Sequence, residues 1–155
     1  MKTKTQVHAD DGRPDLLITR DFDLPVERLF LAYEMPQLVA QWMGTEVIKL
    51  ENRRHGGWQF ETRNAEGATV FAAHGCIHEF TRPERIVRTF EMTSAGFPPQ
   101  LEFLEFEAIS DSSSRLRMQI VFRSVQARDR QLQLPFAYGL NMAHDRLESV
   151  LSELA

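Results

Sequence analysis

Four side chains that can do chemistry lie close together in the apolar segment 68–80: His74, Cys76, His78 and Glu79. On a helix, two histidines four residues apart would share one face and could bind one metal ion. This segment instead predicts a strand, along which four residues span about 13 Å. One ion bound about 2.1 Å from each imidazole nitrogen cannot bridge that distance. We therefore predict no metal site here, and each histidine remains a separate candidate for lining a binding site.

The sequence leaves open which face of this strand points inward. Alternate side chains of a strand point to opposite sides of the sheet. One set contains Phe71, Ala73, Gly75, Ile77 and Glu79; the other contains Val70, Ala72, His74, Cys76, His78 and Phe80. The first set would turn Glu79 inward, and the second would turn both histidines inward. A bulge near Gly75 would let the strand switch faces.

Glu79 has two interpretations. A carboxylate buried without a partner would have a raised pKa and could act as a general acid or base. Buried beside Arg20 or Arg88, it would form a structural ion pair. We favour the ion pair.

Nucleophilic catalysis finds little support. The chain has no Gly-x-Ser-x-Gly turn, and the serines at 112–114 fall in a predicted turn without a base beside them. Cys76 lies in an apolar strand, which is typical of a small buried hydrophobe rather than a reactive thiol. The pattern favours binding over catalysis, and it predicts no cofactor.

Composition narrows the class of protein further. The chain has 155 residues, is 43% hydrophobic, carries a net charge of −4 and contains one Cys. The hydrophobic fraction predicts a folded domain, and the acidic balance argues against nucleic-acid binding. A single cysteine excludes an internal disulfide framework. Without a signal segment or about 18 consecutive apolar residues, we expect a cytoplasmic protein with no membrane span.

Hydrophobic periodicity predicts the elements that must position these residues. We expect residues 1–14 to form a flexible arm and residues 15–155 to form a single domain. The domain begins with a strand and two short helices. Pro36 separates the two helices, and Gly44 ends the second one. Six strands and one helix follow, at 45–51, 58–63, 68–80, 85–92, 101–109, 115–122 and 136–154. A turn at 129–134 precedes the last helix.

The C-terminal helix has one apolar stripe, which contains Phe136, Leu140, Ala143, Leu147, Val150 and Leu154. The polar residues His144, Asp145, Arg146 and Glu148 lie off this stripe and are expected to face water. An antiparallel sheet can bury one face against such a helix, and sheet twist favours a curved sheet. The fold class is therefore α+β. The space between sheet and helix would be a cavity, or bulky side chains would fill it.

Five motifs in order resemble a known superfamily. They are ITRDFDLP (18–25), PQLVAQWMG (36–44), GGWQF (56–60), the run from Gly75 and Glu79 to PERIV (83–87), and YGL (138–140) with Leu147 and Leu151. Together they resemble the START-like SRPBCC superfamily, and more closely its branch of heat-shock-protein-90 ATPase activator homologues. The resemblance covers about residues 15–154.

The resemblance implies the helix-grip fold, a curved antiparallel sheet around a long C-terminal helix. It also implies an internal cavity that takes apolar molecules in many relatives. Where relatives commonly have Gly-Trp in the last helix, this chain has Gly139-Leu140, which would enlarge the cavity. We therefore predict an apolar or aromatic ligand bound by Trp42, Trp58, Phe60, His74, His78, Glu79, Phe90, Met118, Phe136 and Tyr138.

Two other functions stay open. A protein-interaction domain, like a co-chaperone or regulator, would have an exposed apolar patch and a filled interior. A cyclase-like or hydrolase-like enzyme would use the same cavity, with Glu79 or His78 as acid or base. Its activity would titrate with that group.

Overall fold

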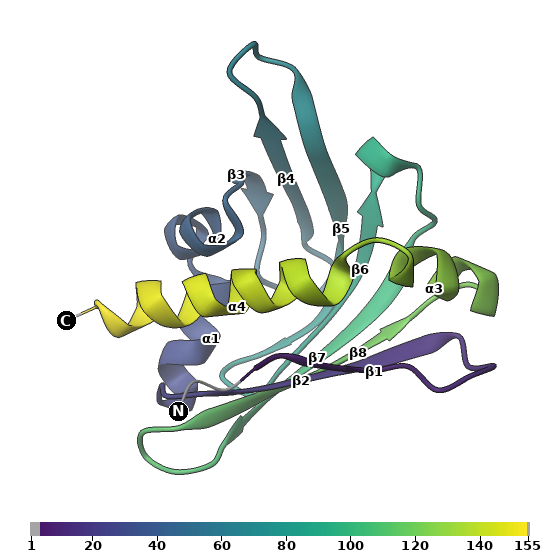
Figure 1. Cartoon of the computed structure of the whole chain (residues 1–155). Coiled ribbons are helices and arrows are strands. Elements are labelled where there is room, and N and C mark those ends of the chain that lie inside the picture. Colours follow the sequence, from purple (N-terminus) through teal and green to yellow (C-terminus); the bar gives the residue numbers. More distant parts are fainter. Residues whose placement is uncertain (1–3, 155) are drawn as a thin grey trace.

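A computed structural model describes residues 4–154 of the chain (Figure 1). The strands are β1 (Gln6–His8), β2 (Asp15–Phe22), β3 (Glu46–Leu50), β4 (Gly57–Arg63), β5 (Thr69–Thr81), β6 (Arg85–Met92), β7 (Gln100–Ala108) and β8 (Ser114–Val121). The helices are α1 (Val26–Glu34), α2 (Pro36–Met43), α3 (Val125–Leu132) and α4 (Phe136–Ser152), with a 3₁₀ turn η1 (Thr93–Ala95).

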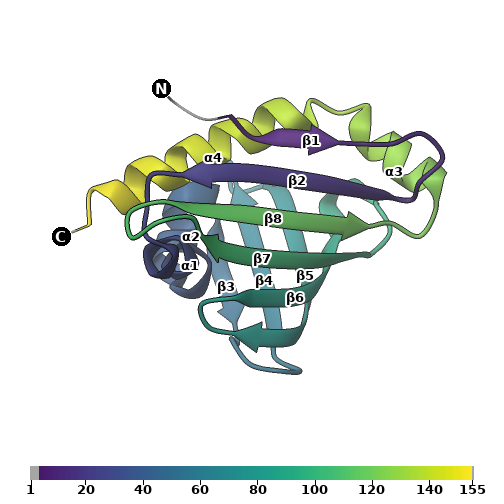
Figure 2. The same cartoon turned by 90° about the horizontal axis from the view of Figure 1, so that it is seen from below.

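All of the strands join in one antiparallel sheet with the order β1-β2-β8-β7-β6-β5-β4-β3. The sheet bends strongly, so that β3, β4 and β5 stand steeply against β1, β2, β7 and β8 (Figures 1 and 2). Helix α4 crosses the concave side. The α1–α2 pair connects β2, near one edge of the sheet, to β3 at the other edge. The predicted α+β architecture, a curved sheet around the C-terminal helix, is confirmed.

Alternating burial explains how the sheet meets the helices. In β8, Leu116, Met118 and Ile120 are buried on the concave side, whereas Arg115 and Arg117 lie on the outer side. The same alternation occurs in β7, with Leu104 and Phe106 buried. Each strand thus contributes one apolar face, and opposite charges pair on the polar face, where Arg117 is 3.8 Å from Glu107.

The two short helices end where the sequence predicts. Pro36 begins α2 directly after α1, because proline fits the first turn of a helix and disfavours helical backbone in the residue before it. Gly44 ends α2 with φ at +65°, a left-handed conformation that glycine adopts without strain. This turn leads the chain directly into β3.

Two polar segments form elements that the sequence did not predict. Gln6–His8 forms β1, which pairs with β2, although we expected a flexible arm over 1–14. Residues 1–3 of that arm lie outside the described residues. Helix α3 replaces much of the expected turn at 129–134, and its first turn is capped by Ser124, whose hydroxyl accepts a hydrogen bond from the Ala127 N–H at 3.1 Å.

Strand β5 switches faces, but not near Gly75. Ala73 and Ile77 are buried, so the Phe71–Ile77 set faces inward through this part of the strand. The register against β6 shifts between Ile77 and Glu79, and beyond this irregularity Phe80 packs against the core. The first set of side chains therefore faces inward up to Ile77, and the second set faces inward at Phe80. The bulge that causes this switch lies at 77–79.

Gly75 is required by a close approach between strands. The Trp58 indole N–H donates a hydrogen bond to the Thr89 carbonyl oxygen at 3.1 Å, directly beside Gly75. A Cβ at Gly75 would lie 1.9 Å from that oxygen and 2.6 Å from the indole nitrogen. No side chain fits there without moving backbone.

We expect Gly75→Ala to lower the free energy of unfolding by at least about 3 kcal/mol, the upper end of ordinary overpacking costs. Gly139→Ala is the matched control, since a Cβ there meets nothing within 4 Å. This control is expected to stabilise α4 by up to about 1 kcal/mol. Urea unfolding of both variants measures the difference, and equal stabilities would contradict the packing described for Gly75.

Candidate functional site

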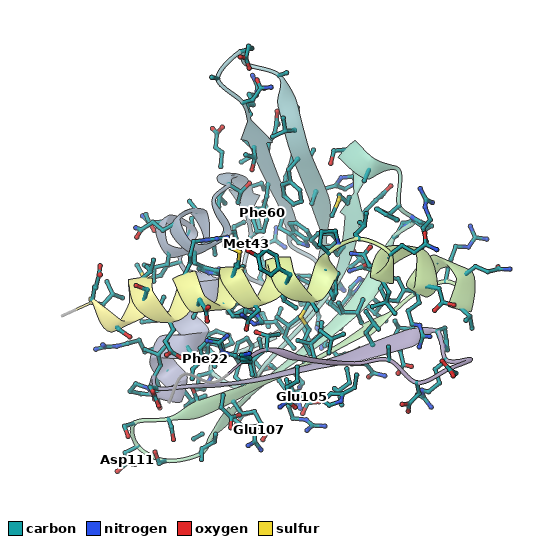
Figure 3. All side chains as sticks on the ribbon, viewed as in Figure 1. Phe22, Met43, Phe60, Glu105, Glu107 and Asp111 are labelled. Carbon is teal, nitrogen blue, oxygen red and sulfur yellow. The ribbon has the colours of Figure 1, made fainter. Side chains whose placement is uncertain are left out.

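A cavity of about 550 Å³ lies between the concave face of the sheet and the N-terminal half of α4. Its apolar lining comes from every layer of the fold: Ile18, Trp42, Met43, Phe71, Phe90, Met92, Met118, Ile120, Leu134, Pro135, Phe136, Gly139, Leu140 and Ala143. Figure 3 places Met43 and Phe22 on opposite sides of α4, whereas Glu105 and Glu107 point away from the helix on the outer face of the sheet. The cavity lies on the inner side of the sheet and is partly open to solvent, because Leu134, Pro135 and Gly139 of its lining are exposed.

Four of the predicted ligand-binding residues line this cavity: Trp42, Phe90, Met118 and Phe136. Trp42 is 4% exposed, and its indole N–H donates a hydrogen bond to the Ala32 carbonyl oxygen at 2.7 Å. Because its polar atom is already satisfied by α1, Trp42 presents an apolar ring to the cavity.

Trp58 and Phe60 lie in a separate part of the core. They pack with Val39, Ala73 and Ile77 beneath the steep part of the sheet, and neither is among the cavity-lining residues. Trp58 contacts Phe90, with ring centroids 5.3 Å apart. These two aromatic residues thus support a wall residue from behind.

The remaining predicted site residues lie away from the cavity. His74 is half-exposed, with its Nε2 atom 3.3 Å from a Glu91 carboxylate oxygen, and His78 is exposed. Tyr138 is 69% exposed on the outer side of α4. None of the three is among the cavity-lining residues.

Glu79 forms an ion pair, as favoured, but with a different partner. The Arg85 Nε atom donates to its carboxylate at 2.8 Å, and the Thr81 hydroxyl donates at 3.0 Å. Arg20 and Arg88, the partners expected from the sequence, pair with Asp145 and Glu102 instead. The hydrogen bond from Arg85 lowers the pKa of Glu79, so the raised pKa that an acid catalyst needs is absent.

The lining also contains six polar side chains that the sequence analysis did not assign to the site: Tyr33, Arg88, Gln100, Glu102, Gln131 and His144. The most enclosed charges belong to an ion pair between β6 and β7. The Arg88 Nε atom donates to Glu102 at 2.9 Å, and their side chains are 11% and 3% exposed. Gln100 donates to the second oxygen of Glu102 at 3.0 Å.

A sequence signal for this pair existed. Arg88 has the same strand parity as the apolar Ile86 and Phe90, and Glu102 has the same parity as Leu104 and Phe106. Charges at alternate positions within two otherwise apolar strand faces indicate a buried pair when the strands are neighbours.

We expected His144 to face water, and this prediction is wrong: His144 is only 1% exposed. Its Nδ1 atom lies 2.6 Å from the Thr5 hydroxyl, and its ring meets Phe22 edge-on. The neighbouring Asp145 forms an ion pair with the buried Arg20 at 2.8 Å. His144 thus lies on the same helix face as the buried Leu147 and Leu151, and Thr5 satisfies its ring nitrogen there.

Burial keeps two of these polar side chains uncharged. Burial and, to a smaller extent, the nearby charge of Arg20 lower the pKa of His144 to about 3, while Asp145 acts in the opposite direction. Burial also raises the pKa of Tyr33 far above its usual value. At neutral pH both side chains are therefore neutral hydrogen-bonding groups.

Other kinds of site receive no support from the geometry. Among residues 4–154, no group of three or more His, Cys, Asp or Glu side chains is placed to hold a metal ion. In the same part of the chain, no helix combines the length and apolar character that crossing a bilayer requires.

A curved antiparallel sheet around a long C-terminal helix is the helix-grip fold of START-like proteins, and this chain has that fold. A solved structure from Rhodobacter sphaeroides is 20% identical and superimposes with a TM-score of 0.86, covering 97% of this chain and 100% of that one. Protein Ms6760 from Mycobacterium smegmatis is 18% identical with a TM-score of 0.84, covering 98% and 99%. CalU16 from Micromonospora echinospora is 20% identical with a TM-score of 0.69, covering 99% and 88%.

The chain belongs to the family described as activator of Hsp90 ATPase homolog 1-like protein, whose model matches residues 23–152. This membership agrees with the resemblance found in the sequence motifs. Family and fold together define a ligand-binding or regulator-like domain. No curated protein matches the chain.

We expect His144 to make stability depend on pH. Its folded pKa of about 3 lies below the ordinary value of 6.5, so between these values the unfolded state binds a proton that the folded state rejects. The stability it contributes is complete above pH 6.5 and is lost as the pH falls toward 3. At about 1.4 kcal/mol per pH unit, the loss from pH 6.5 to pH 5 is about 2 kcal/mol.

Urea unfolding at pH 7, 6 and 5 measures this dependence. His144→Gln should flatten it, because the replacement does not titrate. His74→Gln, which alters a half-exposed histidine, is the control and should retain the wild-type slope. A wild-type slope in His144→Gln would contradict the assignment.

Proposed function

We propose that the protein binds a mainly apolar small molecule in the cavity between the sheet and α4. The observation that carries this proposal is the cavity of about 550 Å³ with its lining of aliphatic, aromatic and methionine side chains. Sites for drug-sized ligands have volumes of about 300–1,000 Å³ and similar linings. Trp42, Phe90, Met118 and Phe136 would form the walls that contact the ligand.

Binding is better supported than catalysis. The acid and base candidates from the sequence, Glu79 and His78, do not line the cavity. Of the titratable groups that do, Arg88 and Glu102 are paired with each other, and His144 has a pKa too low for proton transfer near neutral pH. A binding domain accounts for all of these features.

The cavity also weighs against the protein-interaction alternative. That alternative predicted a filled interior, because a surface-acting domain has no use for internal space. Gly139 lines the cavity at an exposed position, where an added Cβ meets nothing within 4 Å. An unfilled cavity is a cost to stability that ligand binding would offset.

Native mass spectrometry of the freshly purified protein tests the proposal directly. We expect a discrete additional mass that disappears on denaturation. A bare mass that persists after incubation with an apolar metabolite extract would contradict the proposal.

A cavity-filling variant gives a second test. Leu140→Trp places an indole in the cavity, and we expect it to weaken binding of the neutral dye N-phenyl-1-naphthylamine at least tenfold, measured by fluorescence titration. Met142→Trp adds the same ring at a 42% exposed position of α4 that does not line the cavity, and it should bind the dye as the wild type does. Unchanged binding in Leu140→Trp would show that the dye lies elsewhere; Gly139→Leu provides the same test if Leu140→Trp does not fold.

A further inference from the structure

The cavity floor carries an ion pair whose charges cancel. Arg88 and Glu102 are directly opposite each other in the β6–β7 register, and the carboxylate of Glu102 has both oxygens occupied, one by Arg88 and one by Gln100. Arg88 also lies over the Trp58 ring, 5.2 Å from its centroid. The guanidinium is thus fixed in place by Glu102 and by an aromatic ring.

The rest of the lining adds no charge. Its other titratable side chains are Tyr33 and His144, and burial keeps both neutral at pH 7. Arg20, which lies behind His144, is paired with Asp145. A charged ligand would therefore lose part of its hydration in a mainly apolar cavity without a free counter-charge, which carries a desolvation cost.

Several hydrogen-bonding atoms of the lining remain available. Only the Nε atom of Arg88 donates a hydrogen bond within the described residues, so neither of its Nη atoms has an acceptor there. In the same part of the chain, the Tyr33 hydroxyl and the His144 Nε2 atom have no hydrogen-bond partner, although these side chains are 7% and 1% exposed. A ligand oxygen would satisfy these groups.

A contribution to stability does not by itself explain the buried Arg88–Glu102 ion pair. Replacing a buried ion pair with apolar residues of similar size is often neutral or stabilising, so its presence is weak evidence for a structural role. A guanidinium with its Nη donors free beside a cavity fits recognition of an oxygen acceptor. Cancellation of its charge by Glu102 fits an acceptor that is itself neutral.

Resting on the proposed function, we propose that the ligand is an uncharged, largely apolar molecule with a carbonyl or hydroxyl oxygen that accepts a hydrogen bond from Arg88. The paired Glu102 lets the arginine act as a donor without selecting an anion. Tyr33 and His144 provide further neutral contacts for a polar group of the same ligand.

Two dyes with one framework test the requirement for neutrality. N-phenyl-1-naphthylamine is neutral, whereas 8-anilino-1-naphthalenesulfonate adds a sulfonate to the same rings. In fluorescence titrations of the wild-type protein, we expect the neutral dye to bind at least tenfold more tightly. Equal or tighter binding of the sulfonate would overturn this inference but leave the proposed function intact, whereas binding of neither dye would overturn both.

Displacement of the neutral dye tests the role of Arg88. We compare 1-naphthol with 1-methylnaphthalene, which differ by a hydroxyl and a methyl group, and take the ratio of their inhibition constants. In the double variant Arg88→Met/Glu102→Leu, which leaves no unpaired charge, we expect this ratio to shift at least fivefold toward the methyl compound.

The control is Arg117→Met/Glu107→Leu, which removes an ion pair of the same charges from the outer face of the sheet. It should keep the wild-type ratio, and thermal unfolding confirms that both variants are folded. An unchanged ratio in Arg88→Met/Glu102→Leu would overturn the proposed contact with Arg88.

Discussion

The buried guanidinium of Arg20 fixes the position of α4 over the sheet. Arg20 lies on β2 with 1% exposure, and it donates hydrogen bonds to Asp145 at 2.8 Å and Asn141 at 3.1 Å. Removing one partner of a buried charge typically costs about 3–5 kcal/mol, so helix and sheet cannot slide past each other freely. Arg146 adds a hydrogen bond to the Trp42 carbonyl oxygen, which ties the same part of α4 to α2.

This attachment explains where the cavity lies. The fully buried residues of α4 are His144, Leu147 and Leu151, all in its second half. The first half, which contains Phe136 and Leu140, is only partly buried and lines the open volume. The buried residues of the second half of α4 contribute to the core, and the first half lines the cavity. The cavity therefore does not interrupt the core packing around Leu147 and Leu151.

The architecture was predictable because apolar periodicity is strong in most elements. Strand and helix boundaries agree closely with prediction wherever one face is buried, as in β8 and α4. The exceptions, β1 and α3, are polar, and their order comes from pairing with β2 and from the cap at Ser124. The β1–β2 pairing depends on a segment elsewhere in the chain, and the cap depends on the geometry of one side chain. Hydrophobic periodicity detects neither kind of contact.

The cavity lining could be predicted from the sequence only in its apolar part. Large residues on inward faces, such as Phe90 and Met118, could be recognised from alternation alone. The polar residues were misjudged because their burial depends on tertiary partners: the irregularity at 77–79 and the contact with Arg85 kept Glu79 outside, while Thr5 and Arg20 lie beside the enclosed His144. His144 follows Leu140 by four residues and precedes Leu147 by three, so helical periodicity places it beside the buried stripe; its polar side chain, not its position, led to the wrong expectation.

The residues that hold α4 in place therefore differ from those that line the cavity. The contacts of Arg20 and the apolar residues around Leu147 hold the helix, and none of them needs the cavity to be empty or full. The volume depends on Gly139 and Leu140, and the polar character depends on the Arg88–Glu102 pair. Under the proposed function, substitutions at these few positions would change which molecule fits while the anchored half of α4 stays in place, because each set of residues contacts a different part of the helix.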